Sequence, residues 1–327
     1  MAAGLGTRLR PLTWDIPKPI VPVANATAIE HLLALLAAHR VERAIANLHW
    51  FGDRVRRVVG DGSGLGISLE YSDEPQLLGT AGGVRAVRDF LCANGEEPFI
   101  VMAGDTLTDV DLSALVAAHR QNGGVATLAV KQVDDVSRYG VVVADAKRRI
   151  TGFQEKPDPA EALSDLSNCM IYVFSPQIFE HFPTESGPLD FANDIFPALL
   201  AQDVPFHLHQ IDAYWNDIGS LPEYLRGNLD AVEGRVALHH LAGRIVGPDD
   251  AAELGRGVSI SGRVLLGDGA VIGERVRLDG PLVVGPGAKI GAAAKLKESV
   301  LLAGAEIATD AIVARAIIGN AAELRAD

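Results

Sequence analysis

The N-terminal segment MAAGLGTRLRPLTWDIPKPIVPV combines two glycines with fixed positive charge, a pattern suited to binding phosphate. Gly4 and Gly6 allow the backbone to approach a phosphate closely and to point N–H groups at it. Arg8 and Arg10 supply guanidinium groups that match phosphate oxygens, and Lys18 lies between two prolines that stiffen its path. A Gly-x-Gly pair alone is a weak signal, but with TRLRPLT and PKP at this spacing it indicates a phosphate-binding loop.

The formal net charge of −13 limits what else the chain could bind. Nucleic acid and anionic membranes demand a positive surface, so neither is expected as a partner. The sequence has no run of about 18 apolar residues and no basic leader before an apolar stretch, so neither a membrane span nor a signal peptide is expected. Two cysteines, Cys92 and Cys169, cannot form a disulfide framework and fit a reducing cytoplasm.

The elements that must position the loop alternate between helix and strand patterns. Helices are predicted at 28–39, 53–62, 81–92 and 111–119, and strands at 44–50, 67–72 and 98–104. This alternation predicts an α/β fold with a Rossmann-like, mostly parallel sheet, in which ligands bind beyond the carboxyl ends of the strands. Asp105 follows a strand at this edge and is a candidate ligand of Mg²⁺, which prefers hard oxygen donors. Asp109 and Asp111 are expected to cap the next helix.

The second part of the chain has a different period. A small aliphatic residue recurs at every sixth position in eight consecutive repeats: Val258, Val264, Ala270, Val276, Leu282, Ala288, Ala294 and Val300. A hexapeptide period is typical of a parallel β-helix, in which each repeat forms one face of a triangular coil. The sequence therefore predicts two domains, 1–235 and 236–327, joined after the helical stretch SLPEYLRGNLDAV.

Taken in order, the motifs resemble the sugar-phosphate nucleotidyltransferase family, most closely its mannose-1-phosphate guanylyltransferase branch. The likeness includes the N-terminal loop, GTAGG (79–83), GDTLTDVDL (104–112), YGVV (139–142), EKP (155–157), YWNDIG (214–219) and the hexapeptides. It implies a nucleotidyltransferase domain followed by a left-handed parallel β-helix. It also implies a reaction in which a sugar 1-phosphate attacks the α-phosphate of a nucleoside triphosphate and releases pyrophosphate. The attacking oxygen is already ionised, so no general base is required.

The resemblance assigns roles to particular residues. It implies that Arg8 and Lys18 are catalytic cations and that Asp217 is a second carboxylate on the metal ion of Asp105. The implied nucleotide-binding residues are Ala3, Gly4, Gly6, Thr7, Gly79 and Thr80.

For the sugar phosphate, the resemblance implies that Glu155 bonds ring hydroxyls and that Lys156 holds the phosphate. Gly140 is expected to let the backbone approach the sugar, and Asn168 to bond a hydroxyl. The family usually has a glycine two residues after Asn168, whereas this chain has Met170. That departure leaves the identity of the sugar open.

Glu74 bears on the choice of base. It lies five residues before Gly79, where the uridylyl- and thymidylyl-transferring branches tend to carry Gln. Guanine presents two adjacent donors, N1–H and N2–H₂, and a carboxylate accepts both. Uracil and thymine present one donor flanked by carbonyls, for which Gln is the better partner. Glu74 therefore favours GTP, with a solvated loop acid in SDEP as the competing interpretation.

The N-terminus departs from the family pattern. The first strand of the family normally precedes the loop and ends in Leu-Ala-Ala-Gly, and Met1 stands in the place of that Leu. The first strand of domain 1–235 is therefore expected to be missing, and a misplaced start codon is the simplest explanation.

Three functions remain open from the sequence. The first is synthesis of GDP-mannose or a related GDP-sugar. The second is the same reaction with another pair, as in glucose-1-phosphate thymidylyl- or uridylyltransferases or an N-acetylmuramate-1-phosphate uridylyltransferase. The third is a non-catalytic regulatory paralogue that binds nucleotide-sugar, which retention of the whole set of charged residues disfavours. The β-helix has no histidine after His240, so it is expected to mediate homo-oligomer formation rather than acyl transfer.

Overall fold

The computed structural model describes residues 1–184 and 187–325, so the last two residues of the predicted 236–327 domain lie outside the described residues. The chain forms two compact units. Unit 1 consists of Met1–Leu5, Leu36–Thr106 and Val110–Trp215, and unit 2 of Gly6–Leu35, Leu107–Asp109 and Asn216–Asp327. The N-terminal segment Gly6–Leu35 thus belongs with the C-terminal part of the chain. The boundary at residue 235 stays a prediction.

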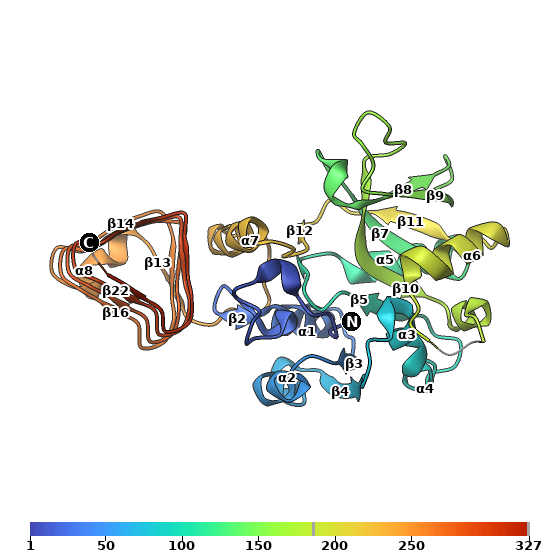
Figure 1. Cartoon of the computed structure of the whole chain (residues 1–327), viewed down its shortest axis with the longest axis horizontal. Helices are drawn as coiled ribbons and strands as arrows, with labels where there is room; N and C mark the ends of the chain where they lie inside the picture. The colour runs from blue at the N-terminus through green and yellow to red at the C-terminus, as the bar shows by residue number, and fades with distance from the viewer. Residues whose placement is uncertain (185–186, 326–327) are drawn as a thin grey trace. The chain divides into compact units, whose positions relative to one another are not determined.

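Unit 1 is built on a six-stranded sheet of order β11-β7-β10-β8-β9, with β5 also paired to β10 (Figure 1). Its strands are β5 (Phe99–Met102), β7 (Ala126–Gln132), β8 (Gly140–Ala144), β9 (Ile150–Glu155), β10 (Leu166–Phe174) and β11 (His207–Gln210). β7 and β11 are parallel, whereas β10 is antiparallel to β5, β7 and β8. A separate parallel pair joins β3 (Arg43–Leu48) to β4 (Ser68–Asp73). The α/β class is confirmed, with antiparallel partners around β10 added to the parallel pairs.

The helices of unit 1 include those predicted at 53–62, 81–92 and 111–119, and one further helix near residue 200 that was not predicted. They are α2 (Gly52–Val59), α3 (Gly79–Ala86), α4 (Arg88–Leu91), α5 (Leu112–Asn122) and α6 (Phe196–Ala201), with short turns at Ser63–Leu65, Val136–Arg138, Pro176–His181 and Phe191–Ile195. The helix predicted at 81–92 is interrupted at Val87, which separates α3 from α4. Asp111 caps α5 by accepting a hydrogen bond from Ala114 N at 2.9 Å, as expected. The cap predicted for Asp109 is wrong, because the N-cap residue of α5 is Asp111; Asp109 Oδ2 accepts from Ala237 N at 2.9 Å.

The core of unit 1 fixes the position of β10. Tyr172 and Phe174 on this strand are fully buried and pack against Phe191 and Phe196. The rings of Phe174 and Phe191 are stacked with centroids 5.0 Å apart. Burying each such side chain contributes about 1.5–3 kcal/mol, so this aromatic cluster holds rigidly the strand that carries Asn168.

The first part of unit 2 contains the N-terminal loop and the elements after it. These are η1 (Thr7–Leu9), η2 (Lys18–Ile20), β1 (Pro22–Val23), β2 (Ala26–Thr27) and the start of α1 (Ala28–Ala38). Unit 2 also contains β6 (Leu107–Thr108) and α7 (Leu221–Glu233). The short strand β12 (Trp215–Asn216) begins at the last residue of unit 1. β1 and β2 form a hairpin whose turn residues, Ala24 and Asn25, both have positive φ. The hairpin is tied to α7, since Ala24 N donates to Asn228 Oδ1 at 2.9 Å and the Tyr224 hydroxyl donates to the Pro22 carbonyl.

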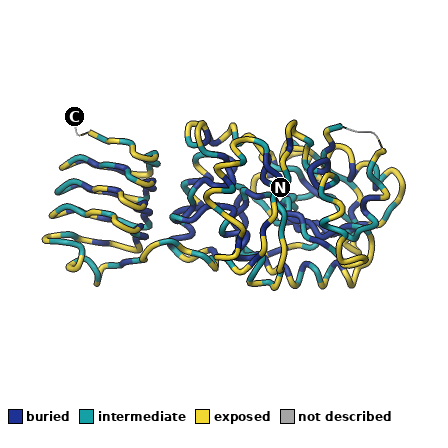
Figure 2. The backbone as a smooth tube through the Cα atoms, turned by 90° about the horizontal axis from the view of Figure 1, so that it is seen from below, coloured by how far each residue is buried: buried dark blue, intermediate teal, exposed yellow. Residues whose placement is uncertain are grey.

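The rest of unit 2 is the predicted parallel β-helix. Its strands form three sheets, β13-β15-β18-β21-β24, β14-β17-β20-β23 and β16-β19-β22-β25, with α8 (Ala251–Leu254) near its start. The strands run from β13 (Arg244–Val246) through β14 (Ser259–Ser261), β15 (Val264–Leu266), β16 (Val271–Ile272), β17 (Arg277–Asp279), β18 (Leu282–Val284), β19 (Lys289–Ile290), β20 (Lys295–Lys297), β21 (Val300–Leu301), β22 (Glu306–Ile307), β23 (Ile312–Ala314) and β24 (Ile317–Ile318) to β25 (Glu323–Leu324). Figure 2 shows the stacked coils. The strands β15, β18 and β21 are largely buried, whereas β14, β20 and β23 each have one buried residue between two exposed ones.

The hexapeptide residues line the interior of this β-helix. Val264, Leu282 and Ala288 have no exposed surface. Neighbouring coils are parallel, and only β13 runs antiparallel to its partner β15 among the described strands of this region. Val264 pairs with Leu282, and after it Val283 pairs with Val300, so the later coil is one residue shorter. The β-helix is therefore confirmed, and the left hand of its coils stays a prediction.

Over residues 1–184 and 187–325, none of the helices has the length and apolar content that crossing a membrane requires.

Candidate active site

Lys18 is a buried cation of unit 2. Its residue is only 8% exposed, and its Nζ donates a hydrogen bond to the Asp217 carbonyl at 3.0 Å. Gly6 packs directly against it, because a Cβ at position 6 would lie 2.9 Å from Lys18 Cβ. Gly6 also has φ +62, a conformation that favours glycine, and its carbonyl accepts from Thr13 Oγ1 at 2.7 Å. The structure thus brings together Gly6, Lys18 and Asp217, while Arg8 is exposed in η1.

The carboxylate of Asp217 is fixed by the turn that follows β12. Its Oδ1 accepts from Gly219 N at 3.1 Å, and a Cβ at position 219 would lie 2.5 Å from its Oδ2. Ile218 has φ +44, a strained conformation for a β-branched residue, and Asn216 Oδ1 accepts from its N at 2.7 Å. Strained backbone of this kind is retained mainly where it positions a functional group.

In unit 1, residues 1–5 run beside the turn that carries Asp105. Gly104 N donates to the Met1 carbonyl at 2.7 Å, and a Cβ on Gly104 would lie 2.8 Å from that oxygen. Residues 1–6 form no strand, and Ala3 is buried. Nothing lies within 4 Å of a Cβ at Gly4, so this glycine, unlike Gly6, is not required by crowding in the protein itself.

Glu74 is buried, with 3% of its surface exposed. Its Oε1 accepts from Asn47 Nδ2 at 2.7 Å, and its Oε2 accepts from Leu78 N at 3.0 Å. Asn47 Oδ1 in turn accepts from Ala2 N at 2.7 Å. The structure therefore gives this carboxylate a protein donor on each oxygen, and it is not the solvated loop acid of the competing interpretation.

The GTAGG motif is docked through its backbone. Gly79 begins α3 with φ +76, and a Cβ there would lie 2.4 Å from the Leu189 carbonyl, so only glycine fits. Ala81 N donates to the same carbonyl at 2.9 Å. Thr80 Oγ1 donates to Asp190 Oδ2 at 2.7 Å and accepts from Phe191 N. Gly79 and Thr80 are thus held by the segment that begins at Leu189.

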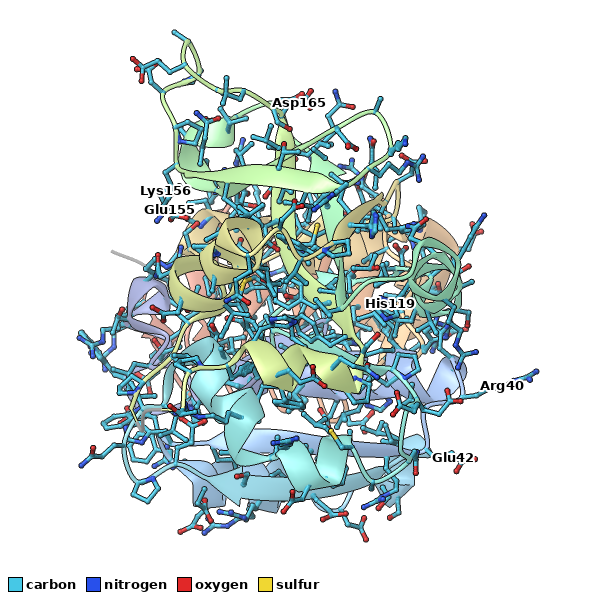
Figure 3. The ribbon with its side chains drawn as sticks, turned by 90° about the vertical axis from the view of Figure 1, so that its right-hand side faces the viewer. Arg40, Glu42, His119, Glu155, Lys156 and Asp165 are labelled. Atoms are coloured by element: carbon cyan, nitrogen blue, oxygen red, sulfur yellow. The ribbon has the colours of Figure 1, made fainter. Side chains whose placement is uncertain are left out.

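Three predicted sugar-site residues meet at the paired strands β8 and β9. Gly140 is opposite Glu155 in the strand register, and a Cβ at position 140 would lie 3.1 Å from Glu155 Oε2. Lys156 Nζ forms an ion pair with Glu155 Oε1 at 3.0 Å, and the two side chains lie together at the surface (Figure 3). Both are more than half exposed. Lys156 also has a left-handed φ of +45, although it is not glycine.

Asn168 lies at an irregularity in β10, where its pairing with β7 shifts register before Tyr172. Its Oδ1 accepts from Met170 N at 3.0 Å, and its Nδ2 donates to the Tyr172 hydroxyl at 3.0 Å. Met170 has φ +56, which explains in physical terms why a glycine suits this position. Burial raises the pKa of Tyr172, so its hydroxyl stays protonated and can take part in this network.

The sequence reasoning missed Asn47, although NLHW at the end of a predicted strand was its visible signal. His49, two residues further along the chain, has its Nδ1 2.7 Å from the Glu74 carbonyl. His119 lies in α5. It is 3% exposed, with its ring nitrogens 3.0 Å from Thr127 Oγ1 and 2.9 Å from Ser175 Oγ.

No group of three or more His, Cys, Asp or Glu side chains in the described ranges 1–184 and 187–325 could hold a metal ion. A protein-only metal centre is therefore not among the arrangements seen there. An ion that takes several ligands from substrate phosphates needs only one or two carboxylates.

The fold is that of an α/β protein with a C-terminal parallel β-helix, and its N-terminal loop carries a buried lysine. Comparison with known families is specific: residues 1–234 match the nucleotidyl transferase family, and residues 260–326 match the GMPPB C-terminal domain. The chain belongs to the nucleotidyl transferase family, as its motifs predicted.

Individual relatives differ in the substrates that they are named for. Over 235 residues the chain is 37% identical to the UTP–glucose-1-phosphate uridylyltransferase of Synechocystis sp., covering 68% of this chain and 60% of the relative. It is 34% identical over 235 residues to the mannose-1-phosphate guanylyltransferase of Mycobacterium tuberculosis, covering 72% and 64%. The chain thus spans less than two thirds of the length of these relatives. The crystal structure of HddC from Yersinia pseudotuberculosis complexed with GMP-PN is similar with a TM-score of 0.60 at 26% identity, covering 69% of this chain and 95% of HddC.

Proposed function

We propose that this protein joins a sugar 1-phosphate to the α-phosphate of a nucleoside triphosphate, giving a nucleotide-sugar and pyrophosphate. The observation that carries the proposal is the burial and fixed position of Lys18. It supports the proposal because the chain belongs to the nucleotidyl transferase family. Burying a lysine ammonium costs free energy unless it is paired and hydrogen-bonded, so a lysine kept in such a place points to a role beyond solubility. Here the ammonium is anchored on the Asp217 carbonyl and its stem is packed against Gly6.

In the proposed reaction a phosphate oxygen of the sugar 1-phosphate attacks the α-phosphorus in line. The bond from the α-phosphorus to the α,β-bridging oxygen breaks, and its electron pair leaves with pyrophosphate. The chain's contribution is to position the two phosphates and to neutralise their charge. Arg8 and Lys18 are the proposed cations for this purpose, with Ala3, Gly4, Gly6 and Thr7 as the nucleotide-binding loop.

A divalent ion, Mg²⁺ in our proposal, would neutralise further phosphate charge when bound. Asp105 and Asp217 are each proposed as its ligands, and the donor chemistry fits because carboxylate oxygens are what Mg²⁺ prefers. The turn around Asp217 supports its assignment. Gly219 N donates to one carboxylate oxygen of Asp217, and the other carboxylate oxygen leaves no room for a Cβ at position 219.

GTP and mannose 1-phosphate are the first substrate pair that we propose. The likeness to the Mycobacterium tuberculosis guanylyltransferase and the match to the GMPPB C-terminal domain support this pair. Glucose 1-phosphate with UTP or dTTP is the alternative, supported by the Synechocystis relative. Glu74 gives only weak support for GTP, because both of its carboxylate oxygens already accept hydrogen bonds from protein donors.

The sugar-phosphate residues are proposed as before: Glu155 for ring hydroxyls, Lys156 for the phosphate, Gly140 for close backbone approach and Asn168 for a hydroxyl. The exposed Glu155–Lys156 pair supports the first two roles, because each charge can be redirected to a ligand at little cost. We also propose that the protein is located in the cytoplasm and that it forms a homo-oligomer through the β-helix.

Pyrophosphate release across a grid of four nucleoside triphosphates and several sugar 1-phosphates tests the function. We expect turnover that requires Mg²⁺ and is fastest with GTP and mannose 1-phosphate. Turnover fastest with UTP or dTTP and glucose 1-phosphate would select the alternative pair. No pyrophosphate above the no-enzyme control in any cell of the grid would refute the nucleotidyltransferase proposal and favour the regulatory paralogue.

A further inference from the structure

Two nucleotide-site loops of unit 1 are joined by a continuous chain of hydrogen bonds. Ala2 N donates to Asn47 Oδ1 at 2.7 Å, and Asn47 Nδ2 donates to Glu74 Oε1 at 2.7 Å. Leu78 N donates to the other carboxylate oxygen at 3.0 Å. The chain starts next to Ala3 and Gly4 and ends next to Gly79. Asn47 and Glu74, at its centre, are 9% and 3% exposed.

The donors and acceptors along this series of hydrogen bonds fix the residue type and orientation of both side chains. Glu74 faces two donors, which an ionised carboxylate can accept but a Gln could not, because its NH₂ would oppose one of them. Asn47 faces a donor on one side and an acceptor on the other, so its amide has only one satisfactory orientation. Hydrogen bonds to a charged group are about twice as strong as neutral ones, and burial of an unmatched pair is costly.

Gly83 on α3 leaves the space that the pair occupies. A Cβ at position 83 would lie 2.6 Å from Glu74 Oε1 and 2.7 Å from Asn47 Nδ2. Since no Cβ fits at these distances, the glycine is needed for the hydrogen bond between the two side chains. Glu74 is held at its main chain too, because its N donates to the Leu48 carbonyl at 2.7 Å.

We infer that Asn47 and Glu74 form an internal bracket whose role is to position the two nucleotide-binding loops, rather than to contact the base. This deepens the proposed function and rests on it. The bracket predicts a specific kinetic result. Weakening it should displace both loops and so raise the KM for every nucleoside triphosphate by a similar factor. A carboxylate that reads guanine would instead change the ratio between GTP and the other nucleotides.

Three single variants weaken the bracket in different ways. Asn47→Asp places two carboxylates face to face. Glu74→Gln places the NH₂ group of the new amide against one of the two donors. Gly83→Ala inserts a methyl group between the side chains while keeping both of them. Each is expected to raise the KM for GTP and UTP alike by about tenfold to a hundredfold, the worth of a hydrogen bond to a charged group. We expect kcat to fall less, because the cations and the proposed metal ligands are untouched. Gly64→Ala is the matched control, because nothing lies within 4 Å of its Cβ.

The decisive variant is the double exchange Asn47→Asp with Glu74→Gln. The introduced carboxylate can accept from Ala2 N and from the introduced amide, whose oxygen can accept from Leu78 N, so every donor regains an acceptor. We expect the double variant to recover most of the KM lost by either single variant, with the GTP/UTP ratio unchanged throughout. Re-pairing the donors would also restore any lost stability, so melting temperatures are measured in parallel and KM is compared at a temperature where every variant is fully folded. A KM change that disappears under that condition would assign the pair a purely structural role.

Two results would overturn the bracket while the wild type remains active: single variants with unaltered KM, or a GTP/UTP ratio that changes with Glu74→Gln and does not return in the double variant. A wild type inactive in every cell of the substrate grid would instead remove the proposed function, and the inference with it.

Discussion

The two lysines predicted to hold phosphate lie in contrasting environments. Lys18 is 8% exposed, packed against Gly6 and anchored on the Asp217 carbonyl. Lys156 has a side chain that is 57% exposed and forms an ion pair with its neighbour Glu155. The first ammonium is set in place by packing before any ligand arrives, whereas the second is held by an exposed ion pair of little energetic worth.

This contrast indicates different work for the two cations. A preorganised charge costs no reorganisation when the reaction occurs, so it acts most strongly on the rate. An exposed, flexible charge must exchange its partner for the ligand, so it acts mainly on binding. Lys18 is therefore expected to affect kcat, and Lys156 to affect the KM for the sugar 1-phosphate.

The largest expected effect is that of Lys18→Met. Removing a preorganised cation from the proposed phosphate site should lower kcat by about a hundredfold to a thousandfold, measured as pyrophosphate release with saturating substrates. Lys295→Met, which removes an exposed lysine on β20, is the control and should retain wild-type rates. If Lys18→Met changes the KM alone, the preorganised role is wrong and the two lysines are equivalent.

Lys156→Met should have a smaller effect of a different kind. We expect the KM for the sugar 1-phosphate to rise about tenfold, the worth of one charge-assisted contact at an exposed position, with kcat changed less. Lys156→Arg should recover most of this loss, because an exposed site tolerates a larger cation. Lys18→Arg should not recover activity, since the packed stem leaves no room. Equal tolerance of Arg at both positions would contradict the contrast.

Local chemistry in the sequence was enough to predict the α/β class, the β-helix and most helices. Gly6 and Lys18 were predicted as parts of one loop, and the structure packs them together. The interior partner of Glu74 could not be predicted, because Asn47 is distant in sequence and its amide has no motif of its own. The cap assigned to Asp109 failed for the same reason, since its partner Ala237 is distant along the chain. Propensity describes neighbours in sequence, whereas these contacts are made by tertiary packing.

A smaller effect tests what holds Lys18 in place. Gly6→Ala puts a Cβ 2.9 Å from Lys18 Cβ at a left-handed φ, so we expect a loss of stability of about 1–2 kcal/mol. Gly4→Ala meets nothing within 4 Å and should leave the free energy of unfolding almost unchanged. Denaturant unfolding of the two variants provides the comparison. Equal stabilities would mean that Gly6 is not what fixes the lysine.

The smallest effect on activity is expected for His119, a buried polar residue that belongs to neither lysine's surroundings. Burial, aided by the charges of His207 and Arg120, lowers the pKa of His119 to about 4. The unfolded chain binds this proton near pH 6.5 and the folded chain only near pH 4, so wild-type stability should fall as the pH drops through that window. His119→Gln should lose less stability there and keep its kcat at pH 7.5. An unchanged pH dependence of unfolding would show that His119 is not held neutral. A large fall in kcat would show that His119, like Lys18 in our proposal, is a buried residue with a functional role.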